Sequence, residues 1–324
     1  TPASATFTTK RVLRMVTGTG PGGGPQVRVF DYLGNPTSQF FAFNSNFRGG
    51  VSVATADTDG DGYDEILAAP VSNGGPQVRI FSPRGTLKHQ FFALPTDFRG
   101  GLNLASGDLN GDGKDEILVA PATGGGPIVR IFDGTGKLKG QFWAFQKDFR
   151  GGVNLSTGDT DGDGRDEVVV SPASGGGPQV RVFSISAGTA RLRSQFFAYS
   201  SSRRMGFTTA VADFLDKDGK PEIITSPTAG GFPVDVRVYS AKGKLRRNFL
   251  AASSTFTGGA TVASGDISGF DSVPEIITAT YSNGLPGVYI FKKKTDTVLQ
   301  RLRSFYAYPQ SFTGGVNLSI GHFK

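Results

Sequence analysis

The sequence predicts an all-β fold, a six-bladed β-propeller of four-stranded antiparallel blades, and three observations support it. A unit of about fifty residues recurs six times, each unit holds four short runs rich in β-branched and aromatic residues, and the two chain ends complement one another. Periods of about 40 to 50 residues are typical of propeller blades, whereas solenoid repeats of that length are helical. Almost no segment shows the 3.6-residue periodicity of a helix.

Two markers define the repeat. The segment Gly-Gly-Pro-Gln-Val-Arg-Val-Phe ends at Phe30 and recurs with few changes, so that its proline falls at Pro25, Pro76, Pro127, Pro178, Pro233 and Pro286. The second marker, Phe-Arg-Gly-Gly or Phe-Thr-Gly-Gly, begins at Phe47, Phe98, Phe149, Phe256 and Phe312. Because the markers stay in phase, we predict one propeller domain over residues 1–324. Its blades are expected at about 314–324 plus 1–46, 47–97, 98–148, 149–203, 204–255 and 256–313.

Each unit contains the four strands of a blade. In the second unit, clusters of Gly, Pro, Asn and Asp separate runs at residues 50–55, 65–70, 77–81 and 90–94. Four such strands make one propeller blade. Residues 314–320 resemble a first strand without its blade, and residues 11–17 resemble a second strand without its first. Pairing of these terminal strands in one blade would close the ring and leave no open strand edge.

An acidic loop follows the first strand of the second unit. It reads Asp57-Thr-Asp59-Gly-Asp61-Gly-Tyr63-Asp64-Glu65, with side-chain oxygens at positions 1, 3, 5 and 9 and a backbone carbonyl at position 7. Calcium takes about six to eight oxygen ligands, and an EF-hand loop begins with a similar spacing. Several carboxylates in so short a turn repel one another without a cation. The loop therefore predicts Ca²⁺ bound by Asp57, Asp59, Asp61, Tyr63 and Glu65.

The loop recurs in four further units. The third and fourth units keep its spacing, and the fifth has one extra residue but is still expected to bind. The predicted ligands are Asp108, Asn110, Asp112, Lys114 and Glu116, then Asp159, Asp161, Asp163, Arg165 and Glu167, then Asp213, Asp216, Asp218, Lys220 and Glu222. The copy in the sixth unit, residues 266–275, loses the turning glycine and the spacing, which leaves binding open there. At the seam His322 occupies the corresponding position, so no site is expected in that blade.

These tandem loops resemble the FG-GAP repeat family of integrin α-type and VCBS-like propellers. The loops stand behind a Phe-x-Gly-Gly entry, which degenerates around Gly206, and before strands that end in Ala-Pro or Ser-Pro at Pro70, Pro121, Pro172 and Pro227. The resemblance covers nearly the whole chain. The family includes integrin α-subunit heads, certain fungal lectins and bacterial surface or secreted proteins, and this version looks bacterial. The resemblance implies calcium at one face and ligands at the loops of the other. Integrin heads have seven blades, so an integrin-like partner is not implied.

Composition narrows the function. The chain has no cysteine, which excludes disulfides and thiolate chemistry, and it has no apolar run of about 18 residues that could span a membrane. The formal charge is +7, while 14 of the 27 acidic residues lie in the three regular loops. The rest of the surface is therefore basic, which could attract acidic polysaccharide or nucleic acid. A soluble basic surface without such a partner is the favoured interpretation, and nucleic acid is not expected.

Few residues outside the loops suggest chemistry. His89 and His322 are the two histidines, and neither has a neighbouring catalytic partner in the sequence. One strand face carries a repeated arginine, at Arg28, Arg79, Arg130, Arg181 and Arg237. A ring of anion sites is the alternative to packing between blades, which we favour. Most aromatic residues of the fourth strands are expected in the core, although Trp143 could be a platform for a sugar.

The sequence thus predicts binding rather than catalysis, with no catalytic residue and no cofactor besides Ca²⁺. We expect an extracellular or cell-surface module that binds a glycan or a surface protein, or that self-assembles in an envelope. Calcium at millimolar extracellular levels suits loops of modest affinity. A calcium-dependent lectin is one alternative. A polysaccharide hydrolase or lyase is another, and it would require carboxylates outside the metal loops to converge in one pocket.

Overall fold

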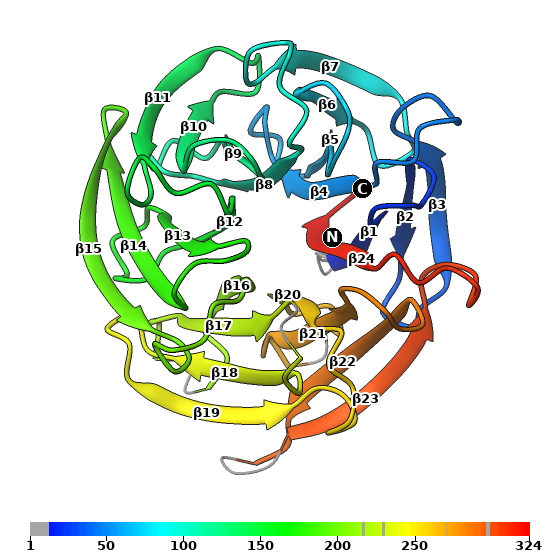
Figure 1. Ribbon diagram of the computed structural model, residues 1–324, viewed down its shortest axis with the longest axis vertical. Helices are drawn as coiled ribbons and strands as arrows, with labels where there is room; N and C mark the ends of the chain where they lie inside the picture. Colours follow the sequence, from blue (N-terminus) through cyan, green and yellow to red (C-terminus); the bar gives the residue numbers. More distant parts are fainter. Residues whose placement is uncertain (1–12, 216–217, 229–230, 270, 296–298) are drawn as a thin grey trace, which may run out of the picture.

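Six four-stranded antiparallel sheets form a ring in the computed structural model, which is the predicted six-bladed β-propeller (Figure 1). The structure describes residues 13–215, 218–228, 231–269, 271–295 and 299–324. These residues form strands and connecting turns with no helix, so none of the described segments is a helix that could cross a membrane. Each blade runs from an inner strand at the axis to an outer strand at the rim.

The strands follow the repeat. Blade 1 holds β24 (Val316–His322), β1 (Leu13–Thr19), β2 (Gln26–Phe30) and β3 (Pro36–Phe41), and blade 2 holds β4 (Val51–Ala56), β5 (Glu65–Pro70), β6 (Gln77–Phe81) and β7 (Leu87–Phe92). Blade 3 holds β8 (Leu102–Gly107), β9 (Glu116–Pro121), β10 (Ile128–Phe132) and β11 (Leu138–Trp143), and blade 4 holds β12 (Val153–Gly158), β13 (Glu167–Pro172), β14 (Gln179–Ser186) and β15 (Thr189–Phe197). Blade 5 holds β16 (Phe207–Ala212), β17 (Glu222–Pro227), β18 (Asp235–Tyr239) and β19 (Leu245–Leu250), and blade 6 holds β20 (Ala260–Gly265), β21 (Glu275–Thr280), β22 (Gly287–Lys293) and β23 (Leu299–Tyr306).

The chain ends close the ring as predicted. Strand β24 pairs with β1 along its length, from Leu13 opposite His322 to Thr19 opposite Val316. Both strands lie two residues later than the sequence suggested, and residues 11 and 12 are outside the described part of the chain. The fourth strand of blade 2 begins earlier than predicted. The turn before it is tight, with Ser82 N–H donating to Thr86 O at 2.8 Å, so pairing resumes at Leu87.

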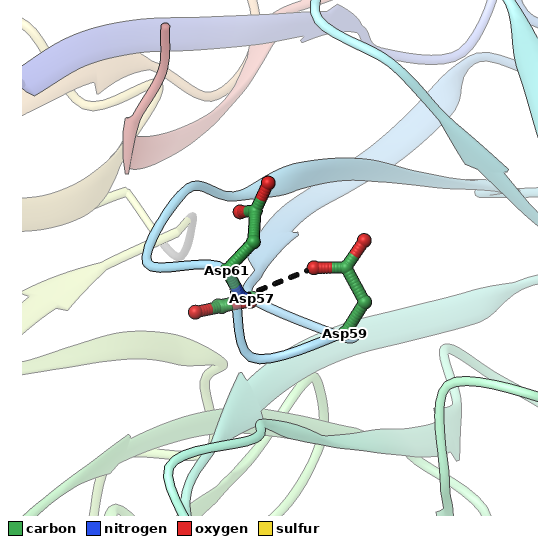
Figure 2. Close-up of side chains that lie close together, drawn as sticks. All are labelled: Asp57, Asp59 and Asp61. Carbon is green, nitrogen blue, oxygen red and sulfur yellow. Dashed lines mark hydrogen bonds between the residues drawn. The ribbon is translucent and has the colours of Figure 1, made fainter.

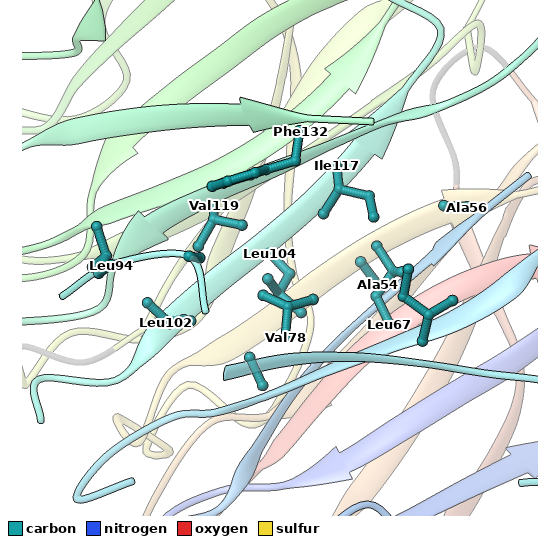
Figure 3. Close-up of a cluster of buried hydrophobic side chains, with 13 residues drawn as sticks. Ala54, Ala56, Leu67, Val78, Leu94, Leu102, Leu104, Ile117, Val119 and Phe132 are labelled. Carbon is teal, nitrogen blue, oxygen red and sulfur yellow. The ribbon is translucent and has the colours of Figure 1, made fainter. Parts of the chain in front are cut away.

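The hydrophobic core lies between neighbouring blades. One cluster packs Leu67 and Val78 of blade 2 against Leu104, Ile117 and Phe132 of blade 3 (Figure 3). The second strand of blades 2 to 6 is buried along its whole length, which explains why it reads as a continuous apolar run rather than an alternating one. Because all six blades repeat one strand order around the ring, the turns between first and second strands recur at one end of it.

Polar side chains link the inner strands around the axis. Asn103 Nδ2 donates to Val153 O, and Asn154 Nδ2 donates to Phe207 O, each at 2.9 Å. These amides face an axial cavity of about 610 Å³. Since both amides satisfy backbone carbonyls of the next blade, the polar lining of the axis serves ring closure in this structure.

Candidate metal sites

The acidic loop of blade 2 connects β4 to β5 and is organised by its first aspartate. Asp57 Oδ1 accepts the N–H of Gly60, and Asp57 Oδ2 accepts the N–H of Gly62, both at 2.7 Å. Both glycines have φ of +82°, a left-handed backbone conformation that residues with a Cβ atom rarely adopt. The alternating glycines therefore allow the loop to curl around the Asp57 carboxylate.

Three carboxylates converge inside this curl. Oxygens of Asp57, Asp59 and Asp61 lie within 4.8 Å of one another (Figure 2). Two lysines approach from outside, with Lys88 Nζ 3.6 Å from Asp59 Oδ2 and Lys324 Nζ 2.9 Å from Asp61 Oδ2. The hydrogen bond from Lys324 lowers the pKa of Asp61 below its usual range. A carboxylate has about four lone-pair sites, so the loop N–H bonds leave oxygen sites for a cation.

The loops of blades 3 and 4 repeat this geometry. Asp108 accepts the N–H groups of Gly111 and Gly113 at 2.7 and 2.8 Å. Asp159 accepts the equivalent groups in blade 4 at 2.7 and 2.9 Å. In blade 4 the oxygens of Asp159, Asp161 and Glu167 lie within 4.8 Å of one another. The structure thus brings together acidic groups that could hold a metal ion in blades 2 and 4.

Blade 3 differs at position 3. Asn110 replaces the aspartate there, and its Nδ2 donates to Glu116 Oε1 at 2.6 Å. The amide oxygen of Asn110 is the atom that would face a cation. Blade 3 therefore offers one negative charge fewer than the loop of blade 2.

The glutamate at position 9 braces each loop. It begins the second strand, is buried, and accepts the N–H of position 2, with Glu65 bound to Thr58 at 3.2 Å and Glu167 bound to Thr160 at 2.9 Å. Burial raises the pKa of Glu116 and Glu167. The structure shows this bracing, while direct ligation of a metal by the glutamates stays a prediction.

Position 7 was predicted to bind through its carbonyl. The N–H groups at this position donate to the carboxylate at position 5, from Tyr63 to Asp61 at 2.9 Å and from Arg165 to Asp163 at 3.0 Å. Lys114 and Lys220 make the same bond, to Asp112 at 2.9 Å and to Asp218 at 3.0 Å. The turn is therefore fixed at position 7 in all four loops, and ligation by the carbonyls stays a prediction.

The loop of blade 5 holds an unpaired carboxylate oxygen. Asp213 Oδ2 accepts the N–H of Gly219 at 2.9 Å, but Asp213 Oδ1 is buried and has no hydrogen-bond partner among the described residues. Glu222 accepts the N–H of Phe214 at 3.0 Å, and the predicted ligand Asp216 lies outside the described residues. A buried acceptor without a partner is costly, and a cation would satisfy it.

Blade 6 departs further. Asp266 Oδ1 accepts the N–H of Gly269 at 2.7 Å, and Asp271 forms an ion pair with Lys292 at 2.7 Å. Glu275 Oε1 is buried without a partner in the part of the chain that the structure describes, and burial raises the pKa of Glu275. This loop keeps the first and last acidic residues of the motif but directs a third toward a lysine.

Sequence reasoning assigned no role to the aspartate at position 8. Asp115 donates its N–H to Asp57 O at 2.8 Å and accepts the N–H of Asp57 at 3.0 Å. Asp64 makes the same two bonds with His322, at 2.7 and 3.0 Å, and Asp166 N–H donates to Asp108 O at 2.9 Å. Asp115 and Asp166 therefore join their loops to the preceding loop, and Asp64 joins its loop to the end of β24.

These linking aspartates have perturbed titration. Burial raises the pKa of Asp64 to about 6 and the pKa of Asp115 and Asp166 to about 7. The signal in the sequence was the residue before the closing glutamate, which is aspartate in the three regular loops and proline, Pro221 and Pro274, in the two altered ones.

Both histidines bond to backbone carbonyls. His322 Nδ1 lies 2.8 Å from Gly62 O, and its ring stacks on Tyr63 with centroids 4.8 Å apart. His89 lies within β7 rather than before it, as the earlier start of that strand requires, and its Nε2 is 2.7 Å from Thr135 O. In these positions the two rings help to join neighbouring blades.

The repeated arginines pack between blades, which is the interpretation favoured from the sequence. Arg79 Nη1 donates to Ala42 O of the preceding blade at 2.8 Å, and Arg28, Arg130, Arg181 and Arg237 do the same to Ala307, Ala93, Ala144 and Ala198. Arg237 also pairs with Asp235 at 2.7 Å. An anion ring is therefore not the arrangement that these side chains form.

Only alternate aromatic side chains of the outer strands lie in the core. Phe142 packs against Phe183, whereas the next residue, Trp143, is 43 % exposed, and Phe41 and Phe197 at the same register are 56 % and 54 % exposed. Alternate residues of an outer strand point to opposite faces, so one ring of each pair must face outward. Lys147 Nζ lies 5.6 Å from the centroid of the Trp143 ring.

The fold and the loops define a six-bladed β-propeller with a ring of acidic turns at one end. The model of the FG-GAP-like repeat matches residues 57–119 and 108–170, which include the loops of blades 2, 3 and 4. The chain therefore carries repeats of the FG-GAP family, as the sequence predicted.

Other comparisons are less informative. No curated protein matches the chain. Among solved structures, exotype rhamnogalacturonan lyase YesX is similar at 16 % identity with a TM-score of 0.48, over 93 % of this chain and 63 % of that one. Rhamnogalacturonan lyase YesW is similar at 13 % identity with a TM-score of 0.42, over 86 % of this chain and 72 % of that one. The chain thus spans less than two thirds of the length of YesX.

Proposed function

We propose that the chain is a calcium-braced β-propeller that acts outside the cell, on a bacterial surface, as a binding module rather than an enzyme. The observation that carries this proposal is the convergence of Asp57, Asp59 and Asp61 within 4.8 Å, in a loop geometry that blades 3 and 4 repeat. Carboxylates this close repel one another unless a cation lies between them.

The donor set fits calcium. Each regular loop offers carboxylate, amide or backbone oxygens and no histidine or cysteine, which favours a hard cation over zinc or copper. Calcium accepts about six to eight oxygens in flexible geometry, whereas magnesium demands a near-ideal octahedron. Asp213 and Glu275 each have a buried oxygen without a partner among the described residues, so we expect calcium in blades 5 and 6 as well.

Bound calcium would neutralise the loop carboxylates, and the linking aspartates would connect that stabilisation between blades. Asp115 holds the loop of blade 3 against Asp57, and Asp166 holds the loop of blade 4 against Asp108. A cation at one loop would thus order its neighbour, so calcium serves the rigidity of the ring rather than a reaction.

Binding rather than catalysis is supported by how the titratable groups are used. His89 and His322 bond to backbone carbonyls of other blades, and the repeated arginines bond to alanine carbonyls. A glycan or a surface protein is the partner we propose, with self-association in an envelope layer as the other use of such a rigid ring. Incubation with plant and bacterial polysaccharides should release no new reducing ends, and their release would contradict the proposal.

The central experiment counts calcium and measures its effect on stability. Elemental analysis should find three to five calcium ions per chain, and the thermal midpoint should fall sharply in chelator. When the free calcium concentration is about 100 times the Kd of a site, binding there adds about 3 kcal/mol to the free energy of unfolding. Magnesium at the same concentration is the control and should restore little. A chain without calcium and without a chelator effect would overturn the metal assignment.

A further inference from the structure

The junction between blades 5 and 6 breaks the packing rule of the ring. At four of the other junctions an arginine of the third strand lies over an aromatic ring of the preceding blade. Arg181 is 5.2 Å from the centroid of Phe145, and Arg237 is 4.7 Å from that of Tyr199. At the remaining regular junction Arg130 still bonds to Ala93 O, beside Leu94. These side chains fill the space between the outer halves of neighbouring blades.

Blade 6 has tyrosine where the other blades have arginine. Tyr289 pairs with Thr278 at the register at which Arg181 pairs with Val170. In blade 5, Ala252 follows the outer strand at the position that Phe145 and Tyr199 hold elsewhere. Two large side chains of the repeat are therefore changed at a single junction.

These replacements coincide with an open cavity of about 660 Å³ at this junction. The apolar and aromatic part of its wall includes Phe249, Leu250, Phe256, Leu285 and Tyr289. Leu250 and Leu285 are 48 % and 44 % exposed, so apolar surface faces solvent here. Cavities of about 300 to 1,000 Å³ with apolar walls and a few polar groups are typical of small-ligand sites.

The charged side chains of the wall are cationic. Arg247 and Arg301 both line the cavity, and no aspartate or glutamate is among the described residues that line it. Asn248 also lines it and is bonded to Asp235 at 3.1 Å, but the charge of Asp235 is paired with Arg237 at 2.7 Å. The chain as a whole carries a formal charge of +7. The field in the cavity therefore favours an anion.

We propose that this cavity binds an acidic sugar residue, a hexuronate within an anionic polysaccharide. Aromatic and leucine side chains provide a surface for the apolar face of the sugar ring, and guanidinium groups bind carboxylates with two parallel hydrogen bonds. The inference names the ligand class of the binding module proposed above and rests on that function, but it does not depend on calcium. Thr280, at the end of β21 remote from the acidic loop, lines the cavity.

The test is isothermal titration of the full chain with tri-galacturonate, with galactotriose as the neutral probe. We expect saturable binding of one trimer per chain and none of the neutral trimer. The double variant Arg247→Ala/Arg301→Ala should weaken binding at least tenfold. Arg84→Ala, which removes an exposed arginine of blade 2, is the control and should bind like the parent chain. Absence of binding, equal binding of both trimers, or an unchanged affinity in the double variant would each overturn the proposal.

A second variant tests the site by rebuilding the repeat. Ala252→Tyr/Tyr289→Arg copies the side chains of the junction between blades 4 and 5, where Arg237 lies over Tyr199. The rebuilt junction should fill the cavity and abolish binding while the chain keeps its thermal midpoint or gains a few degrees. Retained binding in this folded variant would place the ligand elsewhere. Calcium counting is independent, so a chain that binds calcium but no tri-galacturonate would refute this inference alone.

Discussion

Blades 2 to 4 and blades 5 and 6 share one sheet topology but differ where the first and second strands connect. In blades 2 to 4 the loop has nine residues, with two glycines near φ of +80° and an aspartate at position 8. In blades 5 and 6 it has ten residues, and a proline stands directly before the closing glutamate, where the shorter loops have that aspartate. Proline has no N–H, so it cannot donate to the preceding loop as Asp115 donates to Asp57. The acidic turns of blades 2 to 4 therefore form a linked row, whereas those of blades 5 and 6 lack this link.

The first aspartate of the loop should show the largest contrast. Asp108 accepts three backbone N–H groups, at 2.7, 3.1 and 2.8 Å, whereas among the residues that the structure describes Asp266 accepts one backbone N–H, that of Gly269. In excess calcium, Asp108→Ala should lower the free energy of unfolding by about 3 kcal/mol and Asp266→Ala by about 1 kcal/mol. Urea unfolding with matched m-values measures both. Equal losses of unfolding free energy in the two variants would mean that hydrogen bonds and metal stabilise the regular loop no more than the loop of blade 6.

The link between loops should give the next effect. Asp115→Pro copies blades 5 and 6 and removes the two hydrogen bonds to Asp57, so we expect a loss of about 2 kcal/mol. Pro221→Ala in blade 5 is the matched control and should change stability little. Hydrogen exchange should become faster in residues 57–65 as well as in the mutated loop. An increase in the exchange rate that is confined to residues 108–116 would show that the two loops are not coupled.

The same link predicts how pH acts on the calcium-free chain. Burial raises the pKa of Asp115 and Asp166 to about 7 in the folded chain, while the unfolded groups titrate near 3.8. The folded state therefore holds more protons between these values, and stability falls as the pH rises from about 4 to 7. Chemical unfolding in chelator at pH 5 and pH 7.5 measures the fall. In Asp115→Asn/Asp166→Asn the fall should shrink, and an undiminished fall would assign it to other groups.

Much of this architecture could be predicted from the sequence because the repeat recurs at a regular spacing along the chain. The spacing from Pro25 to Pro286 fixed the number of blades, and the acidic turns fixed one end of the ring. The linking role of Asp115 was not readable, because it depends on how far one blade rotates against the next. The cavity beside Tyr289 could not be predicted either. The sequence shows that a residue of the repeat has changed, but it does not show whether neighbouring side chains fill the space.

The smallest contrast concerns hydroxyl groups on the inner strands. Thr157 Oγ1 donates to Ser106 O, and Thr55 Oγ1 donates to Ile320 O at 2.7 Å, whereas blade 5 has Val211 at this position. Thr157→Val keeps the shape but removes the bond, so we expect a loss of about 1 kcal/mol. Val211→Thr should raise the free energy of unfolding of the parent chain by a similar amount if blade 5 lies against blade 4 as the regular blades do. A loss in the first variant without a gain in the second would show that blade 5 is set apart at its inner strand as well as at its loop.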